Sequence, residues 1–104
     1  MEGYKRLSTY IFATVIVDLN MKFVARFINL KSRTVDQMQQ AGRSGKQNIA
    51  EGYAMQSLES YIKLCGVAHG SFKELLADYE DFLRQNDLSI WPRDDSRIRV
   101  FRDF

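Results

Sequence analysis

The stretch Gln40–Gly52, QAGRSGKQNIAEG, decides how this chain is expected to fold. In it Ala41, Gly42 and Gly45 recur at a spacing of three or four residues, which places them on one face of a helix. Apolar residues on either side continue that face: Val35, Met38 and Ile49. Because each Gly costs about 1 kcal/mol relative to Ala in a helix interior, two on one stripe indicate close approach of a neighbouring helix.

The rest of the chain predicts more helices of the same kind. Its 104 residues fit a single domain, 1–104, and one Pro with six Gly favours long helices over many short strands. Short connections between helices force antiparallel neighbours. We therefore expect an all-α, antiparallel up-down four-helix bundle with a short fourth helix. The expected helices lie near residues 7–30, 34–52, 57–86 and 93–104.

The first expected helix carries more apolar surface than one core contact needs. One stripe consists of Phe12, Ile16, Leu19, Phe23, Phe27 and Leu30, and a second beside it of Tyr10, Ala13, Val17 and Val24. Together they cover roughly half the circumference, whereas an ordinary surface helix needs a stripe of about 100°. We expect one stripe to face the chain's own bundle and the other to face a partner chain.

The third expected helix also has two distinct faces. Its core stripe consists of Leu58, Tyr61, Ile62, Cys65, Ala68, Phe72, Leu75, Leu76, Tyr79, Phe82 and Leu83. His69 falls among these positions and is expected to be packed. Gly66 and Gly70 lie on the opposite face, where they leave a shallow patch with room for another helix.

Capping residues mark where these helices begin. Thr34 with Gln37 three residues later matches a capping box, and Ser57 is the expected N-cap of the third helix. Gly52 suits the C-terminal stop of the second helix. Beyond Pro92, which interrupts helical geometry, Ile98 and Phe101 line up as an inward-facing pair.

The beginning of the chain imitates a signal peptide, because Lys5 and Arg6 precede an apolar run over residues 10–17. Asp18 interrupts that run, and no small-residue cleavage site follows. The run is too short to span a bilayer. The single cysteine, Cys65, has no partner for an intrachain disulfide, as in most proteins of reducing compartments. We expect a cytoplasmic protein that does not enter a membrane.

Enzymatic and metal-site patterns are missing from the sequence. The segment Gly42-Arg-Ser-Gly45-Lys46 superficially resembles a phosphate loop, but that motif needs four residues between its glycines and a Ser or Thr after the Lys. His69 has no second His or Cys at metal-ligand spacing. Cys65 lies on an apolar stripe that suits an inert thiol. We expect neither an enzyme nor a bound cofactor.

Charge is distributed unevenly along the chain. Residues 1–50 carry eight Lys or Arg against three acids, whereas residues 51–87 carry three against seven. The candidate nucleic-acid contacts are Lys22, Arg26, Arg43 and Lys46. A phosphate-binding surface of this kind would gain strength from repetition around an oligomer. The alternative is an ordinary soluble surface, since the two pairs lie at different heights of an antiparallel hairpin. No exposed aromatic residue is expected among them, so base stacking is not predicted.

Two short motifs carry a resemblance to a known family. NIAEG at Asn48–Gly52 and the segment Gly70-Ser71-Phe72-Lys73-Glu74-Leu75, similar to a GS-x-x-EL pattern, occur in the expected helix order. In these features the chain resembles the four-helix-bundle protein family of 23S rRNA intervening sequences. The family commonly has a proline two residues before the Asn, where this chain has Lys46.

The resemblance implies an architecture and a setting. The family forms homopentamers, and it is similar to the accessory variability determinant of diversity-generating retroelements, a basic pentameric bundle that works with a reverse transcriptase and nucleic acid. It implies RNA or DNA, and a reverse transcriptase or another protein, as partners, and it supplies no catalytic residue. Two functions stay open: non-specific nucleic-acid binding by a homo-oligomer in a ribonucleoprotein or retroelement-type assembly, and a protein-protein interaction scaffold with no nucleic-acid role.

Overall fold

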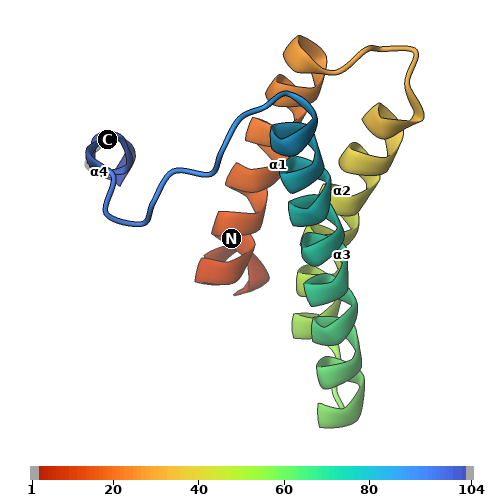
Figure 1. Cartoon of the computed structure of the whole chain (residues 1–104). Coiled ribbons are helices and arrows are strands. Elements are labelled where there is room, and N and C mark those ends of the chain that lie inside the picture. Colours follow the sequence, from red (N-terminus) through yellow and green to blue (C-terminus); the bar gives the residue numbers. More distant parts are fainter. Residues whose placement is uncertain (1–2, 103–104) are drawn as a thin grey trace.

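The computed structural model describes residues 3–102, and these form an all-α helical bundle (Figure 1). In chain order the elements are a 3-10 turn η1 (Gly3–Arg6) and the helices α1 (Ser8–Phe27), α2 (Arg33–Ala54), α3 (Leu58–Gln85) and α4 (Ser96–Arg102). The predicted all-α class and the short fourth helix are confirmed, but that helix does not pack with the other three as a four-helix bundle requires. Two expected boundaries shift inward, because α1 ends before Leu30 and α4 begins after residue 93. Residues 103–104 of the expected fourth helix lie outside the described residues.

The central element is α2, which packs against α1 on one side and α3 on the other (Figure 1). No Cα atom of α1 lies within 8 Å of a Cα atom of α3 among the described residues. The two helices meet instead through aromatic rings near one end of the bundle. The ring centroid of Phe23 lies 4.8 Å from that of Tyr79 and 4.9 Å from that of Phe82. One long side chain thus bridges two helices that α2 holds apart.

The small residues of α2 allow this central position, as predicted. Gly42 is buried with its nearest neighbours, the side chains of Val17 and Asn20, 3.6 Å from where a Cβ atom would stand. Gly45 lies beneath the ring of Phe72 on α3, and a Cβ atom there would come within 2.5 Å of ring carbons. The two glycines therefore face different neighbours, which lets α2 approach both helices closely.

A polar network lies inside this apolar core. Asn20 is 2% exposed, and its amide nitrogen donates a hydrogen bond of 2.9 Å to the carbonyl oxygen of Met38. Its amide oxygen accepts one of 2.7 Å from the hydroxyl of Tyr79. Burial raises the pKa of Tyr79, so this hydroxyl keeps its proton and stays a donor. The network joins α1, α2 and α3, and each buried polar atom in it has a partner.

The helix ends confirm one predicted cap and correct two other predictions. Ser57 caps α3, since its hydroxyl accepts the backbone N–H of Ser60 at 3.1 Å. At α2 the predicted capping box at Thr34 is wrong: the cap is Ser32, whose hydroxyl accepts the N–H of Thr34. Gly52 does not end α2, which continues to Ala54 because Gly52 is buried against α3.

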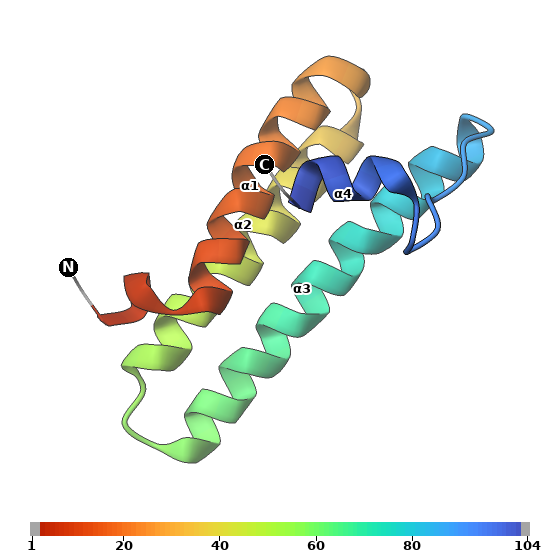
Figure 2. The same cartoon turned by 90° about the vertical axis from the view of Figure 1, so that its left-hand side faces the viewer.

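The last helix, α4, extends away from the other three (Figure 1), and in the view from that side it lies in front of them (Figure 2). Within the described chain, no Cα atom of α4 lies within 8 Å of a Cα atom in α1, α2 or α3. Ile98 was predicted to point into the bundle. Instead it lines an apolar hollow between the end of α3 and the connecting segment, together with Leu83 of α3 and Trp91 of that segment. The side chain of Phe101, its predicted partner, lies outside the described residues.

Several large apolar side chains of α1 and α3 are exposed; those of α3 were expected in the core, whereas one stripe of α1 was expected to face a partner chain. They are Phe12, Leu19 and Phe27 on α1 and Leu58, Ile62 and Leu76 on α3. His69 is exposed too, so the prediction of a packed histidine is wrong. On α1 the second stripe packs, with Ala13, Val17 and Val24 buried, and most of the first stripe faces outward. Because α1 and α3 do not pack along their length, no helix among residues 3–102 covers these positions.

By length and composition, α1 also meets the criterion for a helix able to cross a membrane, and it is the one described helix that does. Its window has a mean hydropathy of 1.2 and is 22% buried. A single such helix is weak evidence, since the core helix of a soluble protein meets the same criterion. The buried residues of α1 pack against α2, as in a bundle helix.

Candidate nucleic-acid interface

The first pair of predicted cations, Arg43 and Lys46, lies on the side of α2 that borders α1. Arg43 is exposed and Lys46 is half-buried. The ammonium of Lys46 stands 5.4 Å from the ring centroid of Tyr10 on α1, within the range of a cation–π contact. This contact orients the Lys46 side chain without neutralising its charge.

The second pair, Lys22 and Arg26, lies on the outer surface of α1. Asn20 and Val24 on this helix are buried against α2, and Lys22, two residues from each, points the opposite way. The guanidinium of Arg26, one turn further, stands 5.4 Å from the ring centroid of Phe27. Both cations are exposed.

The structure does not bring the four cations into one patch. Lys46 lies beside Tyr10, about 18 Å along the helix axis from Lys22, whereas Arg43 follows Gly42, which packs against Val17 and Asn20, and so lies nearer the level of Lys22. The pairs also leave the molecule in different directions, one from the edge of α2 and one from the far side of α1. A single protomer therefore presents two separate basic pairs.

Phe27 corrects the expectation that no aromatic residue is exposed near these charges. Its side chain is 54% exposed beneath Arg26, at the end of the bundle where α1 finishes. Its ring also stacks with Phe23 at a centroid distance of 5.0 Å. Helical periodicity placed Phe27 on one of two apolar stripes without showing which of them packs inside the bundle, so nothing in the sequence distinguished it from its neighbours.

None of the four cations forms an ion pair within residues 3–102. The ion pairs found there are Arg84 with Asp81 at 3.2 Å and Arg97 with Asp95 at 2.8 Å, each between near neighbours in sequence. The positive charge on α1 and α2 is therefore not neutralised by the acids of α3. It stays available to an anion from outside.

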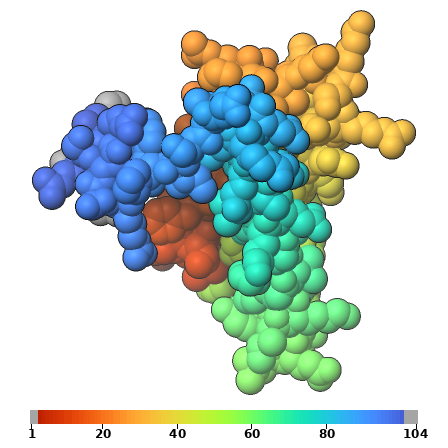
Figure 3. Space-filling view, in the orientation of Figure 1, coloured from red at the N-terminus to blue at the C-terminus, as the bar shows by residue number. Residues whose placement is uncertain are grey.

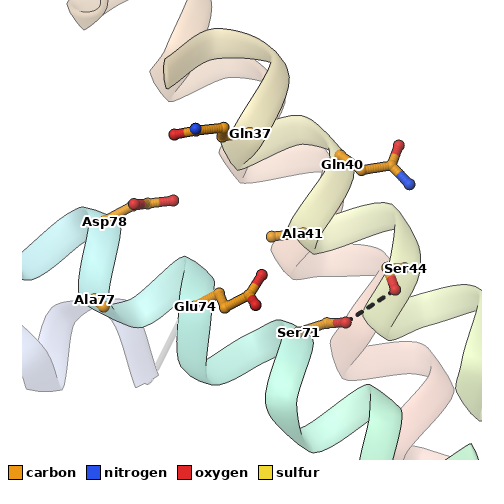
Figure 4. Close-up of a pocket in the computed structure, with 8 residues that line it drawn as sticks. All are labelled: Gln37, Gln40, Ala41, Ser44, Ser71, Glu74, Ala77 and Asp78. Carbon is orange, nitrogen blue, oxygen red and sulfur yellow. Dashed lines mark hydrogen bonds between the residues drawn. The ribbon is translucent and has the colours of Figure 1, made fainter. Parts of the chain in front are cut away.

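A polar pocket of about 520 Å³ lies between α2 and α3 (Figure 4). Its lining is Gln37, Gln40, Ala41 and Ser44 from α2 and Ser71, Glu74, Ala77 and Asp78 from α3. The hydroxyl of Ser71 donates to that of Ser44 at 2.9 Å, which ties the two helices together at one end of the pocket (Figure 4). The sequence shows an excess of acids over residues 51–87, but it does not show that two of them border two glutamines of α2.

This pocket is unsuited to phosphate. Glu74 and Asp78 stand one turn apart on α3 and both line it (Figure 4). The pKa of Asp78 is raised, first because burial removes water from the carboxylate and then because Asp81 and Glu74 repel its charge. An anion would add to that repulsion. This pocket between α2 and α3 is therefore acidic, whereas the four predicted cations stand on α1 and on α2.

No group of three or more His, Cys, Asp or Glu side chains is placed to hold a metal ion among residues 3–102. Comparison with protein-family models, with curated proteins and with solved structures finds no match. The resemblance carried by NIAEG and the later Gly70–Leu75 segment therefore stays a prediction, and the functional argument rests on the charges.

Proposed function

We propose that the protein is a non-enzymatic, homo-oligomeric helical bundle that binds nucleic acid through its phosphates without reading sequence. The observation that carries this proposal is the sidedness of charge. Lys22, Arg26, Arg43 and Lys46 lack ion-pair partners on the part of the chain described, while the acids gather on α3. Lys and Arg side chains without ion-pair partners suit the phosphates of a nucleic acid, and such contacts do not depend on the base sequence.

Assembly and binding are coupled in this proposal. One protomer offers two separated pairs of cations, too few for useful affinity at physiological salt. Repetition in an oligomer raises the effective concentration of each later contact and so multiplies the affinity. The setting, a ribonucleoprotein or retroelement-type assembly with a reverse transcriptase or another protein as partner, and the number five for the ring follow from the family resemblance alone. A cytoplasmic location belongs to the same proposal.

Charge reversal tests the binding directly. We expect wild-type protein to bind both structured RNA and duplex DNA in a fluorescence-anisotropy titration, with affinity falling steeply as salt rises. Arg43→Glu with Lys46→Glu should abolish binding while the mass in solution stays unchanged. Lys22→Glu with Arg26→Glu should weaken it as well.

The matched control reverses two cations on the acidic helix, Lys63→Glu with Lys73→Glu. It changes the net charge by the same amount and should leave most of the binding intact. Equal losses in the control and in the test variants would show that net charge, and not the placement of cations, governs binding. Failure of wild-type protein to bind either nucleic acid at low salt would refute the proposal.

The second candidate, a protein-protein interaction scaffold, is favoured by one observation on α3. Nothing lies within 4 Å of where a Cβ atom would stand at Gly66 or Gly70. These positions are four residues apart on an exposed face, so another helix has room to approach the backbone. Pull-down from the native host before and after nuclease treatment separates the two functions. Protein partners that survive nuclease would favour the scaffold.

A further inference from the structure

The short helix α4 meets its own bundle at one hollow, where Ile98 lies with Leu83 near the end of α3 and Trp91 of the connecting segment. It has seven residues, and isolated helices shorter than about 12–15 residues are marginal in water. The side chain of Val100 on α4 is 69% exposed. Among the described residues, no Cα atom of α1, α2 or α3 lies within 8 Å of a Cα atom of α4. A helix this short needs an apolar partner surface to persist.

Local contacts direct α4 away from the bundle. Asp87 adopts the left-handed region at a φ of 56°, and the N–H of Leu88 bonds back to the carbonyl of Leu83 at 2.8 Å, which ends α3 sharply. At the start of α4 the carboxylate of Asp95 accepts the backbone N–H and the guanidinium of Arg97. These bonds link near neighbours in sequence, so they set the direction of the arm without tying it to the bundle (Figure 2).

The bundle in turn has an apolar surface without an occupant. We define the α1–α3 face as Phe12, Ile16 and Leu19 of α1 with Leu76 of α3. These side chains are 67%, 40%, 61% and 56% exposed. The three on α1 follow at spacings of four and three, so they form one stripe. In Figure 3 the surface of α1 is recessed between α3 and the α4 arm.

We propose that α4 of one copy of this chain packs on the α1–α3 face of a second copy, so that copies join by exchanging this helix. Each copy carries both an α4 helix and an exposed α1–α3 face, and within the described residues of one chain the two do not touch. Exchange of an identical element between protomers is a low-cost route to assembly. Charge also suits it, because Arg99 is exposed on α4 and Glu80, one turn after Leu76, borders the face.

The area favours a contact that each copy makes twice. A helix about 10 Å long and about 10 Å wide covers only a few hundred Å². A specific interface needs about 1,000 Å² in total, so one such contact alone falls short. In a reciprocal pair each copy both donates its α4 and receives the other, so one interface contains the contact twice and its area doubles.

This inference rests on the association of copies in the proposed function, and it is independent of nucleic-acid binding. The test uses two single-cysteine variants in a Cys65→Ser background, one with Val100→Cys and one with Leu19→Cys. They are mixed, refolded together and treated with a short bis-maleimide reagent. A covalent heterodimer of the two variants is expected, because only an α4 that reaches the other chain brings these thiols together.

Mixing Val100→Cys with Lys63→Cys is the control, since Lys63 is exposed on α3 away from the face, and it should give little crosslink. In parallel, Val100→Asp should lower the mass measured by light scattering, while helicity stays unchanged because this side chain is exposed. Leu58→Asp, at a position 72% exposed off the face, should keep the mass.

A monomer at micromolar concentration would overturn the exchange. So would an oligomer that survives Val100→Asp and gives no crosslink between positions 100 and 19, since its copies would join elsewhere. If the crosslink forms and nucleic acid does not bind, only the proposed function fails.

Discussion

Replacing Gly45 by Ala should destabilise the bundle, whereas the same change at Gly42 should stabilise it. The sequence places both glycines on the same face of α2, and both are buried there, so neither property distinguishes them. A Cβ atom at Gly42 would find its nearest neighbours at 3.6 Å, an ordinary van der Waals distance. At Gly45 it would stand 2.5 Å from Cε2 and Cζ of Phe72 and 2.9 Å from Cδ2, so the whole ring would have to move.

The magnitudes follow from two opposing effects. Ala is favoured over Gly in a helix interior by about 1 kcal/mol, and this gain applies at both positions. Overpacking a close contact costs typically about 1–3 kcal/mol, and this cost applies only at Gly45. We therefore expect Gly42→Ala to gain about 1 kcal/mol and Gly45→Ala to lose up to about 2 kcal/mol. Gly66→Ala, with nothing within 4 Å, should match Gly42→Ala.

Urea unfolding followed by far-UV circular dichroism measures these differences, at one protein concentration because association would shift apparent stability. Adding Phe72→Leu to Gly45→Ala tests the cause, because the smaller side chain should remove most of the penalty in a double-mutant cycle. If Gly45→Ala stabilises as much as Gly66→Ala, Phe72 does not rest on Gly45 and the packing of α2 on α3 described above is wrong.

Three further predictions concern polar groups. Asn20→Leu should cost about 1–3 kcal/mol, because it leaves the buried Tyr79 hydroxyl without its acceptor and removes the side-chain hydrogen bond to the Met38 carbonyl, which keeps its helical bond, whereas Tyr79→Phe should cost less. Equal urea midpoints for Asn20→Leu and wild type would contradict the network. Asp78→Asn should raise the free energy of unfolding at pH 7. The pKa of Asp78 is raised on folding, so the protonated carboxyl is favoured in the folded state, and the stability that this proton contributes is fully present below the usual pKa of 3.8 and is lost as pH rises through the folded pKa. At pH 7 the carboxylate is charged and destabilises the fold, and the uncharged Asn removes that cost. The difference between variant and wild type should vanish in acid, as thermal melts at several pH values would show. Ser57→Ala should cost about 1 kcal/mol through loss of the α3 cap, and the thermal midpoint measures it.

The sequence by itself determined the helical class and the small-residue face of α2. Met38, Ala41 and Gly42 repeat with the helical period, and that period alone states which residues share a side of a helix. The cap at Ser57 was also predictable, because a cap is a bond between residues three apart. Features that depend only on near neighbours can be inferred without knowing the fold.

Only the tertiary structure decided what each face meets. Both apolar stripes of α1 suited a core, yet the stripe with Val17 packs on α2 and the one with Leu19 stays outside. Asn20 reads as a surface residue until Tyr79, 59 positions later, supplies its partner. The distance between the two basic pairs, and the projection of α4, likewise depend on how helices cross and end. Helical periodicity records the direction of a side chain and not the element opposite it, so these contacts arise only from the packed chain.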